Sequence, residues 1–130
     1  MEKKLKASAN TILEHSNFIL KEADRLKLDN MKVDLAKIRS SAEDLVSRVD
    51  TLLQTSIEKG SLKVNEIEKG LQKKMRHDLL SPTTAIKGFG EILLEDLIIA
   101  KRKELQIHFN KLLDETNAFI SYVDIIFIEA

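Results

Sequence analysis

Four stretches of the sequence repeat an apolar or small residue at alternating spacings of three and four, and this periodicity constrains the fold most. Such spacing places the repeated residues on one face of an α-helix, so each stretch predicts an amphipathic helix. In chain order the four series are Leu5, Ala9, Ile12, Ser16, Ile19, Ala23 and Leu26; Met31, Leu35, Ile38, Ala42, Leu45, Val49 and Leu52; Leu79, Thr83, Ile86, Gly90, Leu93, Leu97 and Ala100; and Leu105, Phe109, Leu112, Thr116, Phe119, Val123 and Ile126.

Each apolar face is wider than the seam of a two-stranded coiled coil, because further apolar residues such as Leu13, Val46 and Leu80 flank the series. A polar break at 27–30 divides the first two stretches, and one Pro and four Gly in 130 residues leave few other helix breaks. The sequence therefore predicts an all-α fold: an antiparallel four-helix bundle built from two helical hairpins.

The two hairpins share one plan, because a shift of 74 residues, which takes Leu5 onto Leu79, superimposes their apolar series without a gap. Two unrelated amphipathic hairpins would align roughly this well, but the matching turn position favours duplication. The expected organisation is a first hairpin over 1–60, a connector over 61–74 and a second hairpin over 75–130. We expect the connector to be helical, because Leu62, Ile67 and Leu71 are spaced for one more apolar stripe.

Composition excludes several classes of function. Without Cys the chain has no disulfide, thiol nucleophile or Cys-based zinc site. The 21 basic and 21 acidic residues cancel, and six aromatic residues without Trp make a poor stacking platform, so we expect neither nucleic acid nor a membrane as the partner. No targeting signal and no apolar run of membrane-spanning length is present, which predicts a soluble, cytoplasmic chain with a protein partner.

Residues 75–96 carry the candidate chemistry. His77 lies off the apolar face and is expected to be exposed, where a neutral imidazole can attack phosphorus while Asp78 holds or receives its other proton. Pro82 cannot donate a hydrogen bond to the carbonyl of Asp78, so a helix that continues through it should bend beside His77. Alternatively, Ser81 caps a new helix whose first turn contains Pro82.

The letters HDLLSP at 77–82 and AIKGFGEILLE at 85–95 resemble the H-box of bacterial sensor histidine kinases, in their dimerisation and histidine phosphotransfer domain. The resemblance implies that His77 is the phosphoacceptor, that Asp78 orients its imidazole and that Pro82 shapes the helix. Ser81 stands where family members with phosphatase activity often carry a water-orienting Thr or Asn.

Basic residues precede the motif. Lys73, Lys74 and Arg76, with Lys69 before them, are expected to offset phosphate charge or to attract an acidic partner face. Equally, they form a solvated helix face.

The first hairpin departs from the family pattern. The 74-residue shift places Lys3 at the position of His77 and Ser8 at that of Pro82, so the first hairpin is expected to be a degenerate copy without a phosphoacceptor. Family bundles combine hairpins from two subunits, whereas this chain supplies both, which predicts a monomeric pseudo-dimer rather than a homodimer. His15 and His108 flank their apolar series and are expected to have structural roles.

We expect a histidine phosphotransfer module of a two-component phosphorelay. His77 would accept a phosphoryl group from a response-regulator receiver domain, or from a kinase ATP-binding domain, and pass it to an aspartate. The chain has no Gly-rich phosphate loop and no room for an ATP-binding module, so any phosphotransferase activity depends on a partner. No cofactor or metal site is expected in the chain, and Mg²⁺ would come from the partner.

The expected docking surface comprises the exposed faces around 73–90 and the facing part of the last helix near Phe119 to Phe127. Two other interpretations stay open. The chain is a dimerisation fragment of a larger sensor kinase, or it is a docking and regulatory bundle that does not react.

Overall fold

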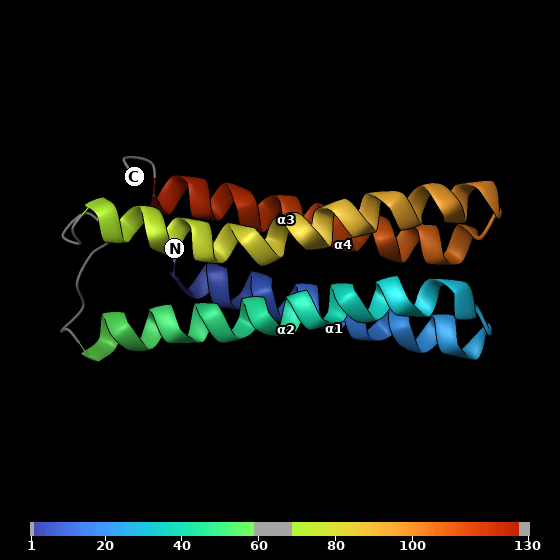
Figure 1. Ribbon diagram of the computed structural model, residues 1–130, viewed down its shortest axis with the longest axis horizontal. Coiled ribbons are helices and arrows are strands. Elements are labelled where there is room, and N and C mark those ends of the chain that lie inside the picture. Colours follow the sequence, from blue (N-terminus) through green and yellow to red (C-terminus); the bar gives the residue numbers. More distant parts are fainter. Residues whose placement is uncertain (1, 59–68, 128–130) are drawn as a thin grey trace.

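The predicted amphipathic stretches form four helices in the computed structural model, which describes residues 2–58 and 69–127. They are α1 (Glu2–Arg25), α2 (Asp29–Glu58), α3 (Lys69–Ile99) and α4 (Lys103–Ile126). Each helix packs against two others: α1 and α3 both contact α2 and α4 (Figure 1). The described residues therefore form an all-α antiparallel four-helix bundle, which confirms the predicted fold class.

The core lies where the periodicity places it. Nearly all residues of the four apolar series are buried, and their side chains meet along the bundle axis. Only series ends differ: Leu26 and Ile126 are half-buried, and Ala100 is exposed because it follows the last residue of α3. The flanking residues Leu13 and Val46 pack partly buried against this core, as the predicted wide apolar faces require.

The two hairpin turns have the same backbone structure. Lys27 and Lys101, which the 74-residue shift pairs, both have a φ of 58°. The amide of the next residue bonds back across the helix end in each case, from Leu28 to the carbonyl of Ala23 at 2.9 Å and from Arg102 to that of Leu97 at 3.0 Å. Both turns are thus Schellman motifs with lysine at the left-handed position that glycine usually occupies.

Replacing either lysine by glycine should stabilise the protein. A left-handed backbone costs an L-residue about 1–2 kcal/mol, so Lys27→Gly and Lys101→Gly should each raise the free energy of unfolding by about 1 kcal/mol. Urea denaturation followed by circular dichroism measures this change. Lys27→Ala, which keeps the strained position, is the control and should not gain stability; equal stability of the alanine and glycine variants would contradict the prediction.

The helix α3 begins within the expected connector. Residues 69–74, which the sequence assigned to the connector, form the first turns of α3, so this part of the connector is helical as expected, and Gln72 is already buried against the bundle. The remaining connector positions 61–68 lie outside the described residues. At this end α2 and α3 extend beyond the start of α1 and the end of α4 (Figure 1).

Two glycines in α3 have different surroundings. A Cβ added at Gly88 would meet nothing within 4 Å, whereas one at Gly90 would lie 2.9 Å from Cδ2 of Leu113. Gly88→Ala should therefore raise the free energy of unfolding by about 1 kcal/mol, the usual helical gain of alanine over glycine. Gly90→Ala should gain less, because the Leu113 side chain has to move. Thermal denaturation of both variants compares their stabilities, and an equal gain would contradict the close contact between position 90 and Leu113.

None of the helices formed by the described residues combines the length and apolarity needed to cross a membrane.

Candidate functional site

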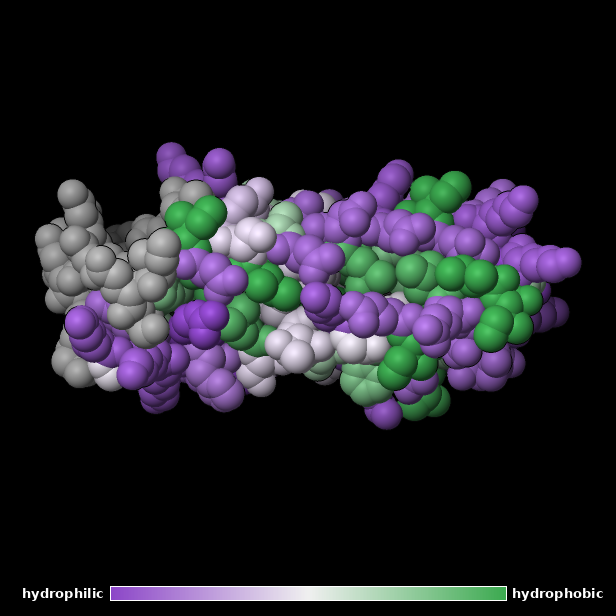
Figure 2. Space-filling model, turned by 90° about the horizontal axis from the view of Figure 1, so that it is seen from above, coloured by the Kyte–Doolittle hydropathy of each residue, from purple (hydrophilic) through white to green (hydrophobic). Residues whose placement is uncertain are grey.

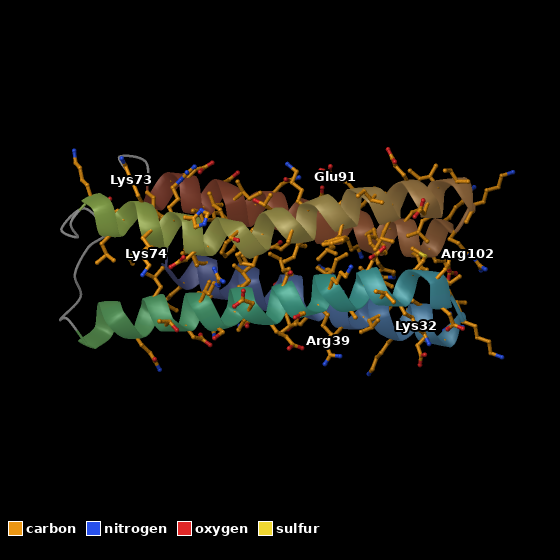
Figure 3. All side chains as sticks on the ribbon, viewed as in Figure 1. Lys32, Arg39, Lys73, Lys74, Glu91 and Arg102 are labelled. Carbon is orange, nitrogen blue, oxygen red and sulfur yellow. The ribbon has the colours of Figure 1, made fainter. Side chains whose placement is uncertain are left out.

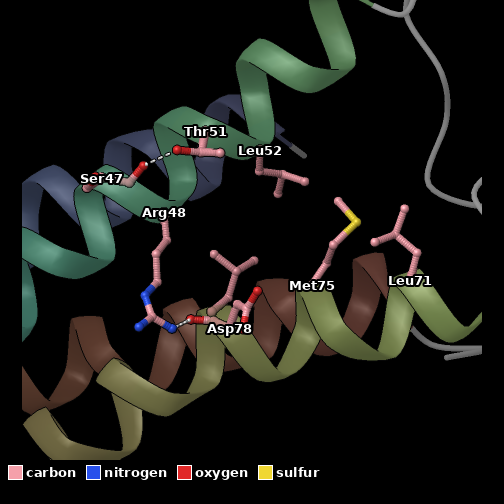
Figure 4. Close-up of a pocket in the computed structure, with 8 residues that line it drawn as sticks. Ser47, Arg48, Thr51, Leu52, Leu71, Met75 and Asp78 are labelled. Atoms are coloured by element: carbon pink, nitrogen blue, oxygen red, sulfur yellow. Dashed lines mark hydrogen bonds between the residues drawn. The ribbon is translucent and has the colours of Figure 1, made fainter.

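The site is centred on a proline inside a continuous helix. Because α3 runs unbroken from Lys69 to Ile99 through Pro82, the alternative in which Ser81 caps a new helix is wrong. Proline has no amide hydrogen, so the carbonyl of Asp78, four residues earlier, lacks its helical donor. Nη1 of Arg48, from α2, donates to that carbonyl at 2.7 Å (Figure 4). A residue of the first hairpin thus provides the hydrogen-bond donor for the backbone carbonyl beside the candidate phosphoacceptor.

The carbonyl of Leu79, the next residue of α3, also accepts a hydrogen bond from a side chain. Thr83 is completely buried, and its Oγ1 donates to the carbonyl of Leu79 at 2.7 Å. The carbonyl oxygens of Asp78 and Leu79 therefore both have side-chain partners, and α3 continues through the proline with these two groups satisfied.

His77 lies on the outer face of α3. Its side chain is exposed, as the sequence predicted, while Asp78 beside it is half-buried. Ser81, one helical turn after His77, is exposed on the same face, and Pro82 is buried. The imidazole is therefore open to a partner while the following residues anchor the helix in the bundle.

The basic residues before His77 separate into two kinds. Lys73 and Lys74 are exposed in the preceding turn and point in different directions from α3 (Figure 3). Arg76 is instead half-buried, and its Nη2 pairs with Oδ1 of Asp124 in α4 at 2.8 Å. The two lysines remain available for an anion, whereas the Arg76 charge already has a carboxylate partner that joins α3 to α4.

The first hairpin has a different arrangement at the equivalent positions. Lys3, at the position of His77, is exposed, and Ser8, at that of Pro82, is buried. Ser8 keeps an amide hydrogen, so the preceding turn of α1 has no carbonyl freed by a proline. The 74-residue shift pairs Arg48 with Tyr122, whose ring centroid lies 5.9 Å from Nζ of Lys4.

A cavity of about 240 Å³ lies between α2 and α3 at the end where these helices extend beyond the other two. Its apolar lining is bordered on one side by the contact between Arg48 and Asp78 (Figure 4). The complete lining is Ser47, Arg48, Thr51, Leu52, Leu71, Met75, Asp78 and Leu79. This volume falls below the roughly 300–1,000 Å³ of ordinary small-molecule sites, so we do not expect a nucleotide to bind there.

Sequence reasoning missed Arg48. Pro82 was the available signal, because it frees a carbonyl that requires some donor. The donor comes from another helix 30 positions earlier in the chain, and helical periodicity carries no information about such a contact.

The stretch of α4 within the expected docking surface, 119–127, contains both buried and exposed residues. Phe119 and Phe127 are buried, with exposed fractions of 0% and 2%, because their side chains fill the core. The nearby residues of α4 that reach the surface are Ser121, Asp124 and Ile125.

A separate apolar area occupies the face that α3 and α4 form towards their turn. Figure 2 shows a hydrophobic strip there between charged edges. The exposed large apolar residues of this end are Ile92, Ile98, Ile99 and Ile107.

The other two histidines lie between α1 and α4. Both are half-buried, and the His108 ring centroid lies 4.3 Å from that of Phe18. Burial lowers the pKa of His15, and the charge of Lys111 lowers it further against the opposing influence of Glu115 and Glu14. These half-buried positions fit the structural roles expected from the sequence.

The lowered pKa of His15 predicts a pH-dependent stability. Since the unfolded state binds the proton of His15 more tightly, the contribution of neutral His15 to the free energy of unfolding is fully present above about pH 6.5. It is lost as the pH falls through the pKa of the folded state. The free energy of unfolding should therefore fall less in His15→Gln than in the original chain between about pH 7.5 and pH 5.5. Urea titrations at several pH values measure this slope, and equal slopes would contradict the prediction.

No group of three or more His, Cys, Asp or Glu side chains suited to a metal ion occurs within residues 2–58 and 69–127. Comparison of the chain with protein-family models, with curated proteins and with solved structures gives no match.

Proposed function

We propose that the chain is a histidine phosphotransfer module of a two-component phosphorelay, with His77 as the phosphoacceptor. The observation that carries this proposal is the arrangement around Pro82 in α3. The exposed imidazole of His77 adjoins the half-buried Asp78, and Arg48 of α2 donates a hydrogen bond to the backbone carbonyl of Asp78. The resemblance of 77–82 and 85–95 to the H-box supports the same reaction.

The proposed reaction moves one phosphoryl group between two side chains. An imidazole nitrogen of His77 attacks the phosphorus of a phospho-aspartate, the P–N bond forms, and the P–O bond to the aspartate breaks so that a carboxylate leaves. Asp78, next in the chain, receives or holds the proton of the other ring nitrogen. In the reverse direction, phosphorylated His77 donates the group to an aspartate.

The proposed partner is a response-regulator receiver domain. Lys73 and Lys74 supply positive charge one turn before His77, where an acidic partner face and the phosphoryl group approach. The partner's carboxylates would bring Mg²⁺, which offsets the phosphoryl charge during transfer. A separate kinase ATP-binding domain is the other proposed source of the phosphoryl group.

We further propose that the chain is a monomeric pseudo-dimer with a silent first hairpin. Contacts of α1 with α4 and of α2 with α3 close the bundle within one chain. The matching turns at Lys27 and Lys101 support duplication. Asp50 and Asp124, also paired by the shift, each form an ion pair within their own hairpin, with Lys6 and Arg76 respectively.

The molecular mass in solution separates this assembly from a homodimeric fragment of a larger kinase. Light scattering coupled to size-exclusion chromatography should give the mass of one chain, 14.8 kDa, across a wide concentration range. A mass of two chains would overturn the pseudo-dimer while leaving His77 a candidate phosphoacceptor.

Phosphotransfer itself is tested by mixing the chain with a panel of phosphorylated receiver domains and measuring the intact mass under neutral conditions. One phosphoryl group should appear on the original chain and none on His77→Ala. Binding without transfer to either chain would contradict the proposal and favour a non-catalytic docking bundle.

A further inference from the structure

We infer that Arg48 is a positioning residue for His77, acting through the carbonyl of Asp78. This inference rests on the proposed function, since it assigns a role in the reaction of that site. It also gives the first hairpin, which has no histidine at the equivalent position, a direct part in the chemistry of the second.

The Arg48 guanidinium is held on both sides. Nη1 donates to the carbonyl of Asp78 at 2.7 Å, and Nη2 pairs with Oδ2 of Asp44, one turn earlier in α2, at 3.1 Å. The planar guanidinium carries five N–H donors in a fixed arrangement, so one side chain satisfies both oxygens without changing its conformation. With 37% of its side chain exposed, Arg48 lies at the border between the core and the surface.

The contact matters because Pro82 makes it necessary. In an ordinary helix an amide at position 82 would donate to the Asp78 carbonyl, and Arg48 would add little. Without that amide, loss of Arg48 leaves the carbonyl beside a largely apolar cavity, and α3 has to shift to hydrate it. His77 precedes Asp78 directly, so such a shift moves the imidazole relative to an incoming phosphorus atom.

The positions that the 74-residue shift pairs with Arg48 and Pro82 show that a replacement donor is required in the second hairpin and not in the first. Tyr122 stands at the position of Arg48, and Ser8, unlike Pro82, keeps its amide hydrogen. Tyr122 approaches the Lys4 side chain, with Nζ 5.9 Å from the ring centroid. The arginine thus occurs opposite the helix that contains the proline, and a tyrosine occurs opposite the helix that does not.

The first experiment labels the full chain with phosphoramidate, a small phosphoryl donor that needs no partner protein. Arg48→Gln should lower the labelling rate at saturating donor about tenfold and leave the half-saturating donor concentration unchanged, because the histidine is displaced while the donor stays accessible. Arg48→Lys keeps one charged donor and should recover part of the rate. Arg39→Gln is the matched control: Arg39 lies in the same helix, pairs with Glu43 and points away from α3 (Figure 3), so its rate should not change.

A double-mutant cycle with Pro82→Ala tests whether Arg48 acts on His77 through the carbonyl of Asp78. The Pro82→Ala substitution would restore an amide donor to the Asp78 carbonyl, so Arg48→Gln in that background should change the labelling rate by less than about twofold. Circular dichroism of each variant establishes that it is folded.

Three results distinguish this inference from the proposed function. A tenfold loss in Arg48→Gln that disappears in the Pro82→Ala background supports the inference. An unchanged rate in Arg48→Gln, or the same loss in both backgrounds, overturns it and leaves His77 as the phosphoacceptor. Absence of label on His77 in the original chain overturns both.

Discussion

Replacing Phe119 by alanine should lower the free energy of unfolding by about 3–5 kcal/mol, the usual cost of a phenylalanine removed from a packed core. Phe119 is completely buried in α4, and the surrounding core is continuous across both hairpins. The residue paired with it by the 74-residue shift is Leu45, also completely buried, so Leu45→Ala should cost about 2–5 kcal/mol.

The continuous core also predicts how these variants unfold. Urea denaturation followed by circular dichroism should give one transition for each, because neither hairpin can retain its buried face once the other separates. Ser121→Ala, an exposed change in the same helix, is the control and should alter stability by less than about 0.5 kcal/mol. A Phe119→Ala variant that loses only half of its helical signal in a first step would contradict the single core.

Replacing His77 by glutamine should abolish phosphoryl incorporation from either a receiver domain or phosphoramidate. Glutamine preserves polarity at this exposed position but has no imidazole nitrogen to attack phosphorus. Since the side chain makes no contribution to the buried core, the thermal midpoint should stay within about 2 °C of the original value.

The remaining histidines provide matched controls for that loss. His15→Gln and His108→Gln remove half-buried imidazoles between α1 and α4, and both variants should still accept one phosphoryl group. Peptide mapping under neutral conditions locates the label. Label on either of these residues, or retained in His77→Gln, would show that the phosphoacceptor had been misassigned.

Helical periodicity alone determined the fold class and most of the core. Alternating spacings of three and four place Ile12, Leu45 and Ile86 on single helix faces, and burial of those faces against one another requires a bundle. The exposure of His77 followed from the same rule, because it lies off the apolar face of its own helix. Its role as phosphoacceptor stays a prediction that the labelling experiments test.

Tertiary structure decided what Pro82 does. Locally, the sequence allowed either a helix start at Ser81 or a helix through the proline, and the packing of α3 between α2 and α4 selected the continuous helix. Packing likewise placed Arg76 against Asp124. Each of these outcomes depends on neighbours distant in the chain.

The contact of Arg48 with Asp78 shows most clearly where the two kinds of information separate. Proline chemistry in the sequence establishes that a backbone carbonyl loses its donor, since the missing amide is a property of one residue. The identity of the replacement donor depends on the register in which α2 packs on α3, and that register is set by the complete core. The sequence alone therefore determined the helices and the loss of a hydrogen-bond donor to the Asp78 carbonyl. The tertiary structure decided that an arginine of the other hairpin replaces that donor.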